Sequence, residues 1–455
     1  MKESKLGVMP INRLLIGVSL PIMISMLVQA LYNIVDSIFV AQINENALTA
    51  VSLAYPVQSL MISIAVGTGV GTNALLSRTL GEKDFEKANR VAANSIFLAV
   101  VSFLAFMTVG LLFSRAYFTS QTADPEIVGY GVAYLSIVCI GSLGKFTQIA
   151  FERLLQATGK TLYSMVSQAA GALLNIILDP ILIFGYFGMP KMGVAGAAVA
   201  TVIGQSVSAV LAIAFNLKVN RELNLNLMGF RPDAGIIRDI YKVGVPSIVM
   251  RSIASVATYG LNNIVIRFSP TACAVLGVYY KLQSFVFMPV FGLNNGMVPI
   301  IAYNYGARNR ERVTETIKLS ITYAVVIMVI GMTVLQLFPG KLLGLFNASE
   351  GMLCIGIPAL RIISLSYVLA GVSVVASSVY QAFGNGVLSL IVALVRQLVV
   401  LLPAAYLLSL LRHVDYVWWA YPLAETITIL LNVAFLRRIY AITRAMEPAE
   451  AVAES

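Results

Sequence analysis

The stretch PVQSLMISIAVGTGVGTNALLSRTLGEKDFEKA (residues 56–88) occurs a second time, in altered form, as KLQSFVFMPVFGLNNGMVPIIAYNYGARNRERV (residues 281–313). The two copies align without a gap at an offset of 225 positions, the difference between 281 and 56. The same offset pairs Pro21 with Pro246. A single offset over that length indicates that the chain consists of two halves built on one plan.

The composition around these copies indicates a membrane protein. The chain of 455 residues is 58% hydrophobic and only 11% charged, with a mean hydropathy of +0.85, so it has too little charge to cover a soluble surface. Twelve apolar segments are long enough to cross a bilayer, and in lipid such segments must be helices. We therefore predict an all-α protein with twelve spans. They lie near residues 14–39, 51–77, 91–113, 132–151, 161–185, 193–217, 243–267, 273–300, 318–338, 354–380, 386–410 and 416–436.

Each half then has six spans, so both halves enter the membrane from the same side. Parallel repeats of this kind are related by a pseudo-twofold axis along the membrane normal, and they rock about a central cleft to give alternating access. A duplicated scaffold without transport, such as a receptor or an assembly anchor, is the alternative. The predicted parts are an N-terminal six-helix bundle (1–217), a cytoplasmic linker (218–242), a C-terminal six-helix bundle (243–438) and a cytoplasmic tail (439–455).

The distribution of Lys and Arg predicts the orientation. The loops on the side of the termini hold most of these residues, and basic loops stay in the cytoplasm. We therefore expect both termini to be cytoplasmic and the protein to lie in the plasma membrane. The net charge of +10 is then a topology signal, which excludes nucleic acid as the partner. The loops on the opposite side hold only Arg115, Lys191, Arg267, Lys341 and Arg412.

Two carboxylates lie inside predicted spans of the first half. A rise of about 1.5 Å per residue places both Asp36 and Asp179 in the outer part of the membrane. Asn33 and Asn175 precede them by three and four residues, on the same helix faces, and Thr201 lies at a similar depth. Two acids in a partly dry pocket are costly to keep ionised, so a proton or a sodium ion would neutralise them. We predict a coupling-ion site here; an acid pair that simply faces water is the alternative.

The charges inside the second half allow more than one interpretation. Arg396 and Glu425 lie at depths where they can form a structural ion pair. Lys281 and Arg361 lie near the outer surface, where they can line the cleft or bind an anionic group. Core packing explains the apolar residues near them equally well. The candidate substrate-cleft residues are Lys281, Tyr280, Gln283, Phe287, Met288 and Arg361.

Several strings of the chain, in this order, resemble the multidrug and toxic compound extrusion (MATE) transporters, in particular the DinF- and MepA-like branch. The resemblance implies efflux of lipophilic, often cationic compounds, driven by a proton or sodium gradient. It also implies a first-bundle ion site at Asp36, Asp179, Asn175 and Thr201. The NorM-type branch adds acids in the second bundle, where this chain has Arg251 and Arg361. The strings are LVQALYNIVDSIFV (27–40), LGEKDFEKA (80–88), NIILDPILIFG (175–185), GVAGAAVATVIGQ (193–205) and YGARNRERV (305–313).

The resulting expectation is a cation-coupled drug antiporter, a monomer whose partners are small drugs and the lipid bilayer. Export of a lipid-linked or polyisoprenyl precursor is the second hypothesis, and uncoupled conductance by an ion channel is the third. The sequence contains no nucleophile–base pair, no metal cluster and no ATP-binding loop, so we expect neither an enzyme nor a cofactor. The only bound ion expected is the coupling proton or sodium.

Overall fold

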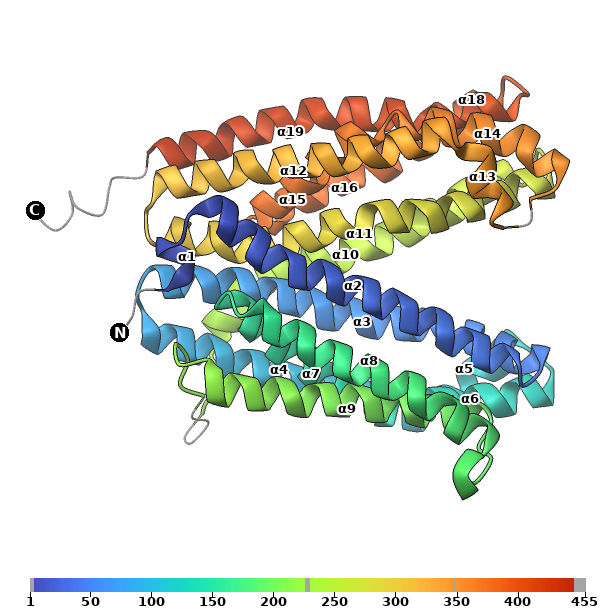
Figure 1. The fold of residues 1–455 in the computed structure, drawn as a ribbon, viewed down its shortest axis with the longest axis horizontal. Helices are drawn as coiled ribbons and strands as arrows, with labels where there is room; N and C mark the ends of the chain where they lie inside the picture. The colour runs from blue at the N-terminus through green and yellow to red at the C-terminus, as the bar shows by residue number, and fades with distance from the viewer. Residues whose placement is uncertain (1–3, 226–229, 347, 446–455) are drawn as a thin grey trace, which may run out of the picture. The chain divides into compact units, whose positions relative to one another are not determined.

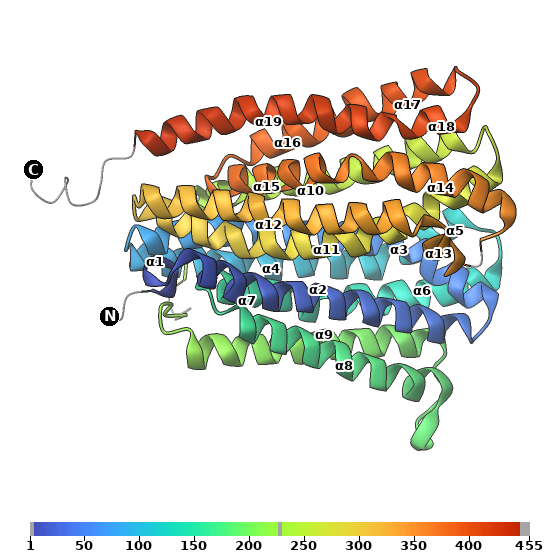
Figure 2. The same cartoon turned by 45° about the horizontal axis from the view of Figure 1, so that its top comes forward.

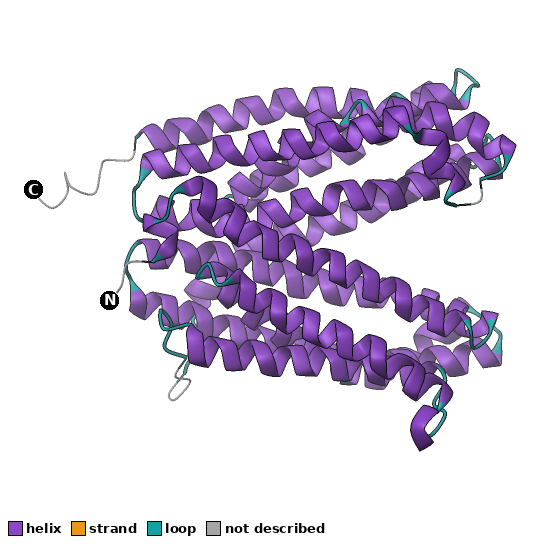
Figure 3. Ribbon diagram, in the orientation of Figure 1, coloured by secondary structure: helices purple, strands orange, loops and turns teal. Residues whose placement is uncertain are grey.

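The computed structural model describes residues 4–225, 230–346 and 348–445, and these form helices joined by short loops (Figure 3). No strand occurs in this described part. Within these ranges, ten helices are long and apolar enough to cross a membrane, and two bent helix pairs bring the number to up to twelve. The prediction of an all-α protein with twelve spans is confirmed. Residues 226–229 of the predicted linker and 446–455 of the predicted tail lie outside the described residues.

Two compact units make up the chain. We call Leu20–Gly244 the N-terminal unit, and Met1–Ser19 with Val245–Ser455 the C-terminal unit. The boundaries fall inside helices rather than in loops, and the first nineteen residues group with the second half, which the predicted bundle 1–217 did not anticipate.

The N-terminal unit contains most of α2 and the helices up to α9 (Figure 1). Asn44 and Asp84 cap α3 and α4, because their side chains accept from the backbone N–H groups of Ala47 and Lys87. The elements are α2 (Ile11–Ala41), α3 (Glu45–Gly81), α4 (Phe85–Leu112), α5 (Ser114–Gln121), α6 (Pro125–Ile140), α7 (Leu143–Ala157), α8 (Thr161–Phe184), a 3-10 turn (Tyr186–Gly188) and α9 (Val194–Val219).

The fourth predicted span is broken into α6 and α7, which meet at 44°. The break falls at Gly141 and Ser142, a glycine–serine pair of the kind that commonly bends helices. A Cβ on Gly141 would lie 2.5 Å from the Val202 side chain, so glycine is also needed for α9 to approach. The predicted end at 151 is wrong, because α7 continues to Ala157 and buries Glu152, which the sequence analysis left in a loop.

Helices α8 and α9 lie side by side along their length (Figure 1 and Figure 2). Their backbones meet at Gly171 and Gly204: a Cβ on Gly171 would lie 2.3 Å from the Gly204 carbonyl oxygen. Near this contact, Ser208 Oγ donates to the Ser167 carbonyl oxygen at 2.9 Å. Small residues therefore bring the two helices close enough for side chains one turn away to bond across them.

The C-terminal unit contains α1 and the helices from the middle of α10 onward. Its helix starts also carry caps: Ser269 accepts from Ala272 N, and Asn309 from Arg312 N. The elements are α1 (Lys5–Val8), α10 (Ala234–Val265), α11 (Pro270–Gly306), α12 (Arg310–Leu337), α13 (Pro339–Gly344), α14 (Glu350–Ser364), α15 (Tyr367–Ala382), α16 (Gly386–Leu394), a π-helical segment (Val395–Leu401), α17 (Leu402–Ser409), α18 (Val414–Trp418) and α19 (Ala420–Arg444).

Polar side chains explain why the first residues belong to the C-terminal unit. Arg312 donates to the carbonyl oxygens of Leu6 and Met9, at 3.0 and 2.8 Å. Asn304 donates to Leu6 as well, at 3.0 Å, and Ser19 Oγ donates to Leu293 O at 3.3 Å. The bonds to Leu6 and Met9 use carbonyl groups that the short helix α1 leaves unpaired at its end.

Two irregularities interrupt the later spans. α14 and α15 meet at 50°, where Ser364 and Ser366 turn their hydroxyl groups back to the carbonyl oxygens of Arg361 and Ile363. The eleventh span contains the π-helical segment just before Pro403. Proline clashes with the carbonyl group four residues earlier, so a wider turn at this place relieves the clash. The hydropathy pattern predicted one unbroken helix for each of these spans.

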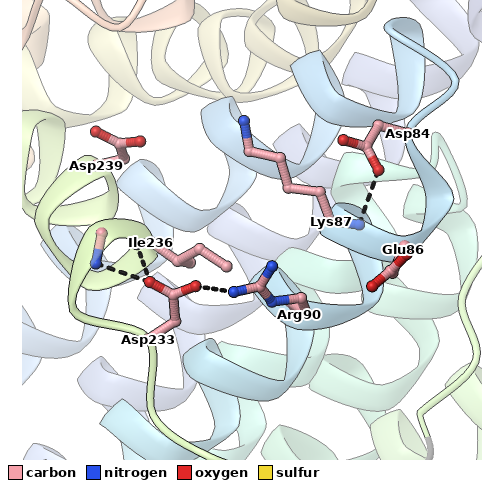
Figure 4. Close-up of a pocket in the computed structure, with 8 residues that line it drawn as sticks. Asp84, Glu86, Lys87, Arg90, Asp233, Ile236 and Asp239 are labelled. Carbon is pink, nitrogen blue, oxygen red and sulfur yellow. Dashed lines mark hydrogen bonds and ion pairs between the residues drawn. The ribbon is translucent and has the colours of Figure 1, made fainter.

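The end of the predicted linker is tied to α4 within the N-terminal unit (Figure 4). Asp233 accepts from the backbone N–H groups of Gly235 and Ile236 at the start of α10, and it pairs with Arg90. Its own N–H donates to Asn94 Oδ1 at 3.0 Å. The bond from Ile236 N–H, with those from Gly235 and Arg90, holds the pKa of Asp233 below its usual range.

Candidate coupling-ion site

The buried carboxylate of Asp179 is held by Asn175, one turn earlier on α8. Asp179 is 0% exposed and Asn175 2%. In either orientation of the Asn175 amide, its nitrogen lies 3.3 Å from an oxygen of Asp179. In the orientation that also satisfies the amide oxygen, this oxygen accepts from the backbone N–H of Thr201 on α9 at 3.1 Å. The Gly171–Gly204 contact, one turn away, is what brings Thr201 within reach.

Asp36 approaches this group from α2. Two contacts between α2 and α8 flank it: Gln168 Nε2 donates to Gln29 Oε1 at 2.8 Å, and the rings of Phe39 and Phe184 have centroids 6.4 Å apart. Asp36 is half-buried, and its Oδ1, shielded from solvent, has no hydrogen-bond partner among the described residues. An unsatisfied carboxylate oxygen is costly, so this atom marks a place where a proton or a cation would be stabilised.

The two carboxylates are near enough to act on one another. Asp36 interacts electrostatically with Asp179, and both acids interact electrostatically with Tyr32 and Tyr134. Tyr134 of α6 is 3% exposed, and its hydroxyl accepts from Gln58 Nε2 at 3.1 Å. Because Gln58 is the donor in that bond, the phenol hydrogen of Tyr134 is free to be given to an acceptor.

A polar cavity adjoins the acids between α2, α7, α8 and α9. Asn175 and Thr201 line it, as do Tyr32, Gln29 and Gln168. Its volume of about 20 Å³ is enough for one water molecule. The acid pair therefore has a polar region beside it within the apolar span.

Carboxylate, hydroxyl and amide oxygens are hard ligands that suit sodium, and the same carboxylates can bind a proton. Within the described ranges, no group of three or more His, Cys, Asp and Glu residues could hold a metal ion. The structure brings together four of the five predicted residues: Asp36, Asn175, Asp179 and Thr201. Asn33 is exposed on α2, where its carbonyl oxygen accepts from Ser37 Oγ.

The pattern that defines the MatE family matches this chain twice, over residues 21–181 and 246–407. The chain belongs to the MatE family. The two matches begin at Pro21 and Pro246, the prolines that the internal repeat pairs. Each half of this MATE protein therefore carries one copy of the family pattern.

Named relatives and solved structures agree with this assignment. The multidrug export protein MepA of Staphylococcus haemolyticus is 29% identical over 410 residues, covering 90% of this chain and 89% of that protein. An outward-facing multidrug resistance MATE family transporter of the MOP superfamily matches with a TM-score of 0.91 at 26% identity, covering 98% and 99% of the two chains. The predicted likeness to MATE transporters and to MepA is confirmed.

A third relative differs in its reported chemistry. It is a MOP superfamily transporter from Pyrococcus furiosus, for which a reversed polarity of the binding pocket is said to suggest a different function. It matches with a TM-score of 0.89 at 27% identity, covering 98% of this chain and 99% of that one. The fold alone therefore does not define the substrate of a family member.

The charged candidates of the second half of this MATE protein lie in different surroundings. Arg396 Nη1 is 3.2 Å from Glu425 Oε1, so these two residues do come together. Lys281 and Arg361 are exposed. The Lys281 ammonium lies 5.7 Å from the centroid of the Phe346 ring, and Arg361 Nε donates to a backbone carbonyl oxygen at 3.3 Å.

The apolar candidates lie mostly in packing. Phe287 is 7% exposed, and its ring meets that of Tyr367 edge-on with centroids 5.3 Å apart. The hydroxyl of Tyr280 is 3.3 Å from that of Tyr421. Gln283 and Met288 are half-buried on α11.

Sequence reasoning missed several polar residues of the N-terminal unit. Tyr134 and Gln58 were not recognised, because a tyrosine and a glutamine in a span have no distinctive pattern. Gln148 and Glu152 do have one, since spacings of three and four residues place them on one helix face with Lys145, a base that lies inside the predicted fourth span. All three are buried, at 5%, 4% and 6% exposed. That polar stripe was the available signal, and the early predicted end of the span hid it.

Proposed function

We propose that this MATE protein is a secondary active multidrug exporter, which exchanges lipophilic, often cationic compounds for protons or sodium ions by alternating access. The observation that carries the proposal is the arrangement of Asp36 on α2 and Asp179 on α8: two interacting carboxylates on neighbouring spans, one fully buried and the other with an unsatisfied oxygen. The multidrug export reported for MepA supports the substrate class.

In the proposed mechanism, the acid pair takes up a proton or a sodium ion from the outside and releases it inside. When the ion is bound, the charge of the pair is neutralised and the pair tolerates a dry environment. When the site is empty, the two ionised carboxylates repel each other and attract water. Loading and unloading thus change which packing of α2 against α8 is stable. Drug binding and ion binding favour opposite states, which couples their movements.

We further propose that both termini face the cytoplasm of the plasma membrane and that the protein acts as a monomer. The excess of Lys and Arg in the loops on the side of the termini supports the orientation. Reaction of single cysteines introduced at exposed loop positions with an impermeant thiol reagent would check it in intact cells.

Transport by purified protein in liposomes tests the proposal. A pH gradient and a sodium gradient are imposed separately while the movement of rhodamine 6G, a fluorescent lipophilic cation, is followed. We expect one gradient to drive accumulation, and Asp36→Asn and Asp179→Asn each to abolish it while protein yield is kept. Gradient-driven transport by both variants at the wild-type rate would contradict the proposal.

A second candidate is the export of a lipid-linked or polyisoprenyl precursor with an anionic headgroup. Lys281 and Arg361 favour it, because both are exposed and no carboxylate pairs with either of them in the part of the chain that the structure describes. Rescue of envelope assembly in a deficient strain would support this function. Resistance to cationic drugs on expression supports the first one.

A further inference from the structure

A second buried titratable group lies in the N-terminal unit, apart from the acid pair. Glu152 of α7 is 6% exposed, and its Oε1 accepts from Gln148 Nε2 at 2.9 Å. Lys145, two turns earlier on the same helix face, is 5% exposed and acts electrostatically on Glu152. Ionisable side chains inside a membrane span are expensive, so a buried glutamate and lysine are candidates for function.

One residue of the cavity lining contacts each group, because Gln148 bonds to Glu152 and Asn175 bonds to Asp179. Gln148 and Lys145 line the cavity from α7, and Asn175 lines it from α8. Gln148 is 4% exposed, yet its Oε1 has no hydrogen-bond partner among the described residues. The cavity has room for one water molecule, which is the group that this unsatisfied oxygen would bond.

Helix geometry places the stripe on the inner side of the cavity. Asp179 lies about 27 Å along α8 from its start at Thr161, whereas Glu152 lies only about 8 Å from the end of α7 at Ala157. Those two helix ends adjoin one short loop, which is cytoplasmic in the proposed orientation. Glu152 is therefore much nearer the inner surface than the acid pair is.

Polar side chains continue beyond Glu152 toward that surface. Arg153 Nη1 donates to Gln156 Oε1 at 2.9 Å, and Gln156 Nε2 donates to Ser164 Oγ at 3.1 Å. From the acid pair to the end of α7, the unit thus contains a nearly continuous run of polar groups, which is unusual for a lipid-embedded bundle.

We propose that Glu152, positioned by Gln148 and Lys145, is an inner proton-binding residue through which this transporter passes protons from the cavity to the cytoplasm. The inference rests on the proposed antiport function and specifies the coupling ion as the proton. In this scheme the proton is taken up at the outer acid pair and is released to the cytoplasm from Glu152.

The proposed step conserves charge and atoms. A proton leaves a carboxyl group of the acid pair, passes through water along the polar groups that line the cavity, and is taken up by the Glu152 carboxylate. An O–H bond breaks on the outer acid and one forms on Glu152, so no charge is created or lost. Release of the proton to cytoplasmic water restores the Glu152 carboxylate.

The groups that face Glu152 determine its response to pH. The charged residues that act on it are Lys145 and Arg153, both on α7. Across the cavity, α2 contributes the titratable Tyr32, and α8 and α9 contribute amides and hydroxyls. From α3 and α4, no described charge acts on Glu152.

The test uses Glu152→Gln, which keeps the size of the side chain and its bond to Gln148 but cannot carry a proton. Proton uptake into liposomes is followed with a trapped pH-sensitive dye while rhodamine 6G is exported. We expect uptake to slow by about a hundredfold and Glu152→Asp to restore part of it. Glu311→Gln, at an exposed acid of α12, is the matched control and should behave as wild type.

A second measurement does not depend on transport. The infrared carbonyl band of protonated carboxyl groups is recorded during a pH titration of the purified protein, and Glu152→Gln should lose one titrating component. If the wild type has this component but exports no rhodamine 6G under any gradient, the proposed function fails and the proton-binding residue stands. If Glu152→Gln shows wild-type proton uptake, or retains every titrating component, the inference is overturned and the stripe is structural.

Discussion

Asn175 lies one helical turn before Asp179 on α8, and its amide nitrogen is 3.3 Å from the Asp179 carboxylate. Asp179 is fully buried, so this donor replaces a hydrogen bond that water would otherwise make. The same amide reaches Thr201 on α9. Binding of an ion to the Asp179 carboxylate therefore affects the spacing of α8 and α9. This contact is the physical basis for coupling ion binding to a change in helix packing.

Replacing Asn175 by alanine tests this connection. The variant removes a hydrogen bond to a charged group, worth about 1–3 kcal/mol, so gradient-driven efflux should slow by about tenfold or more. Asn263→Ala, at an exposed asparagine of α10, is the control and should transport normally. Equal initial rates for the two variants in liposomes would show that Asn175 only packs between the helices.

Gly171→Ala should push α8 and α9 apart, because its Cβ would lie 2.0 Å from Ser208 Oγ and 2.3 Å from the Gly204 carbonyl oxygen. Overpacking of this kind destabilises by about 1–3 kcal/mol, and it would also separate Asn175 from Thr201. Thermal unfolding in detergent and efflux should both be impaired. Gly129→Ala, where a Cβ would meet nothing within 4 Å, should leave both unchanged; a loss of the same size there would contradict the argument.

Much of this site could be predicted from the sequence, because charged side chains are conspicuous in an apolar span. Asp36 and Asp179 needed only their position and depth, and Asn175 and Thr201 followed from helix spacing and from the family resemblance. By the same rule Asn33 shares a helix face with Asp36, yet Asn33 is exposed. Residue spacing shows which side chains share a face but not whether that face points toward the other helices. The orientation of a face depends on packing between helices.

Breaks in helices were the other part that the sequence could not provide. The bends at Gly141 and near Ser364 and the π-helical segment before Pro403 arise from close packing and from local hydroxyl bonds, which a hydropathy pattern does not register. The missed burial of Glu152 has the same origin, since a charged residue at the end of an apolar run resembles the start of a loop.

The ion pair of Arg396 and Glu425 either only stabilises the fold or also takes part in transport, and substitutions distinguish these two roles. Arg396→Met would leave Glu425, whose side chain is 10% exposed, without its cation, and should destabilise the protein by about 3–5 kcal/mol. Adding Glu425→Met should recover most of that stability, as measured by thermal unfolding. If the double variant is stable but inactive in efflux, the pair takes part in transport; wild-type efflux identifies it as structural.

Asp233 gives a dependence on pH outside the membrane. Its folded pKa is lowered, so its stabilisation of the start of α10 is present above the ordinary carboxyl pKa of about 3.9 and is lost as the pH falls below it. Hydrogen exchange should show falling protection of the first turn of α10 between about pH 5 and pH 3, after correction for intrinsic rates. Asp233→Asn still caps the helix through its amide oxygen but does not titrate, so its protection should not change over this pH range; a pH response like that of the wild type would assign the effect to another group.

The central claim is that Asp36 and Asp179 bind the coupling ion in competition with the drug. The most direct measurement is the release of that ion when rhodamine 6G is added to purified protein in weakly buffered detergent solution, with a pH electrode and a sodium electrode in parallel. The account predicts release of a proton or a sodium ion by the wild type and none by Asp36→Asn or Asp179→Asn. Release of the same amount by both variants would contradict it.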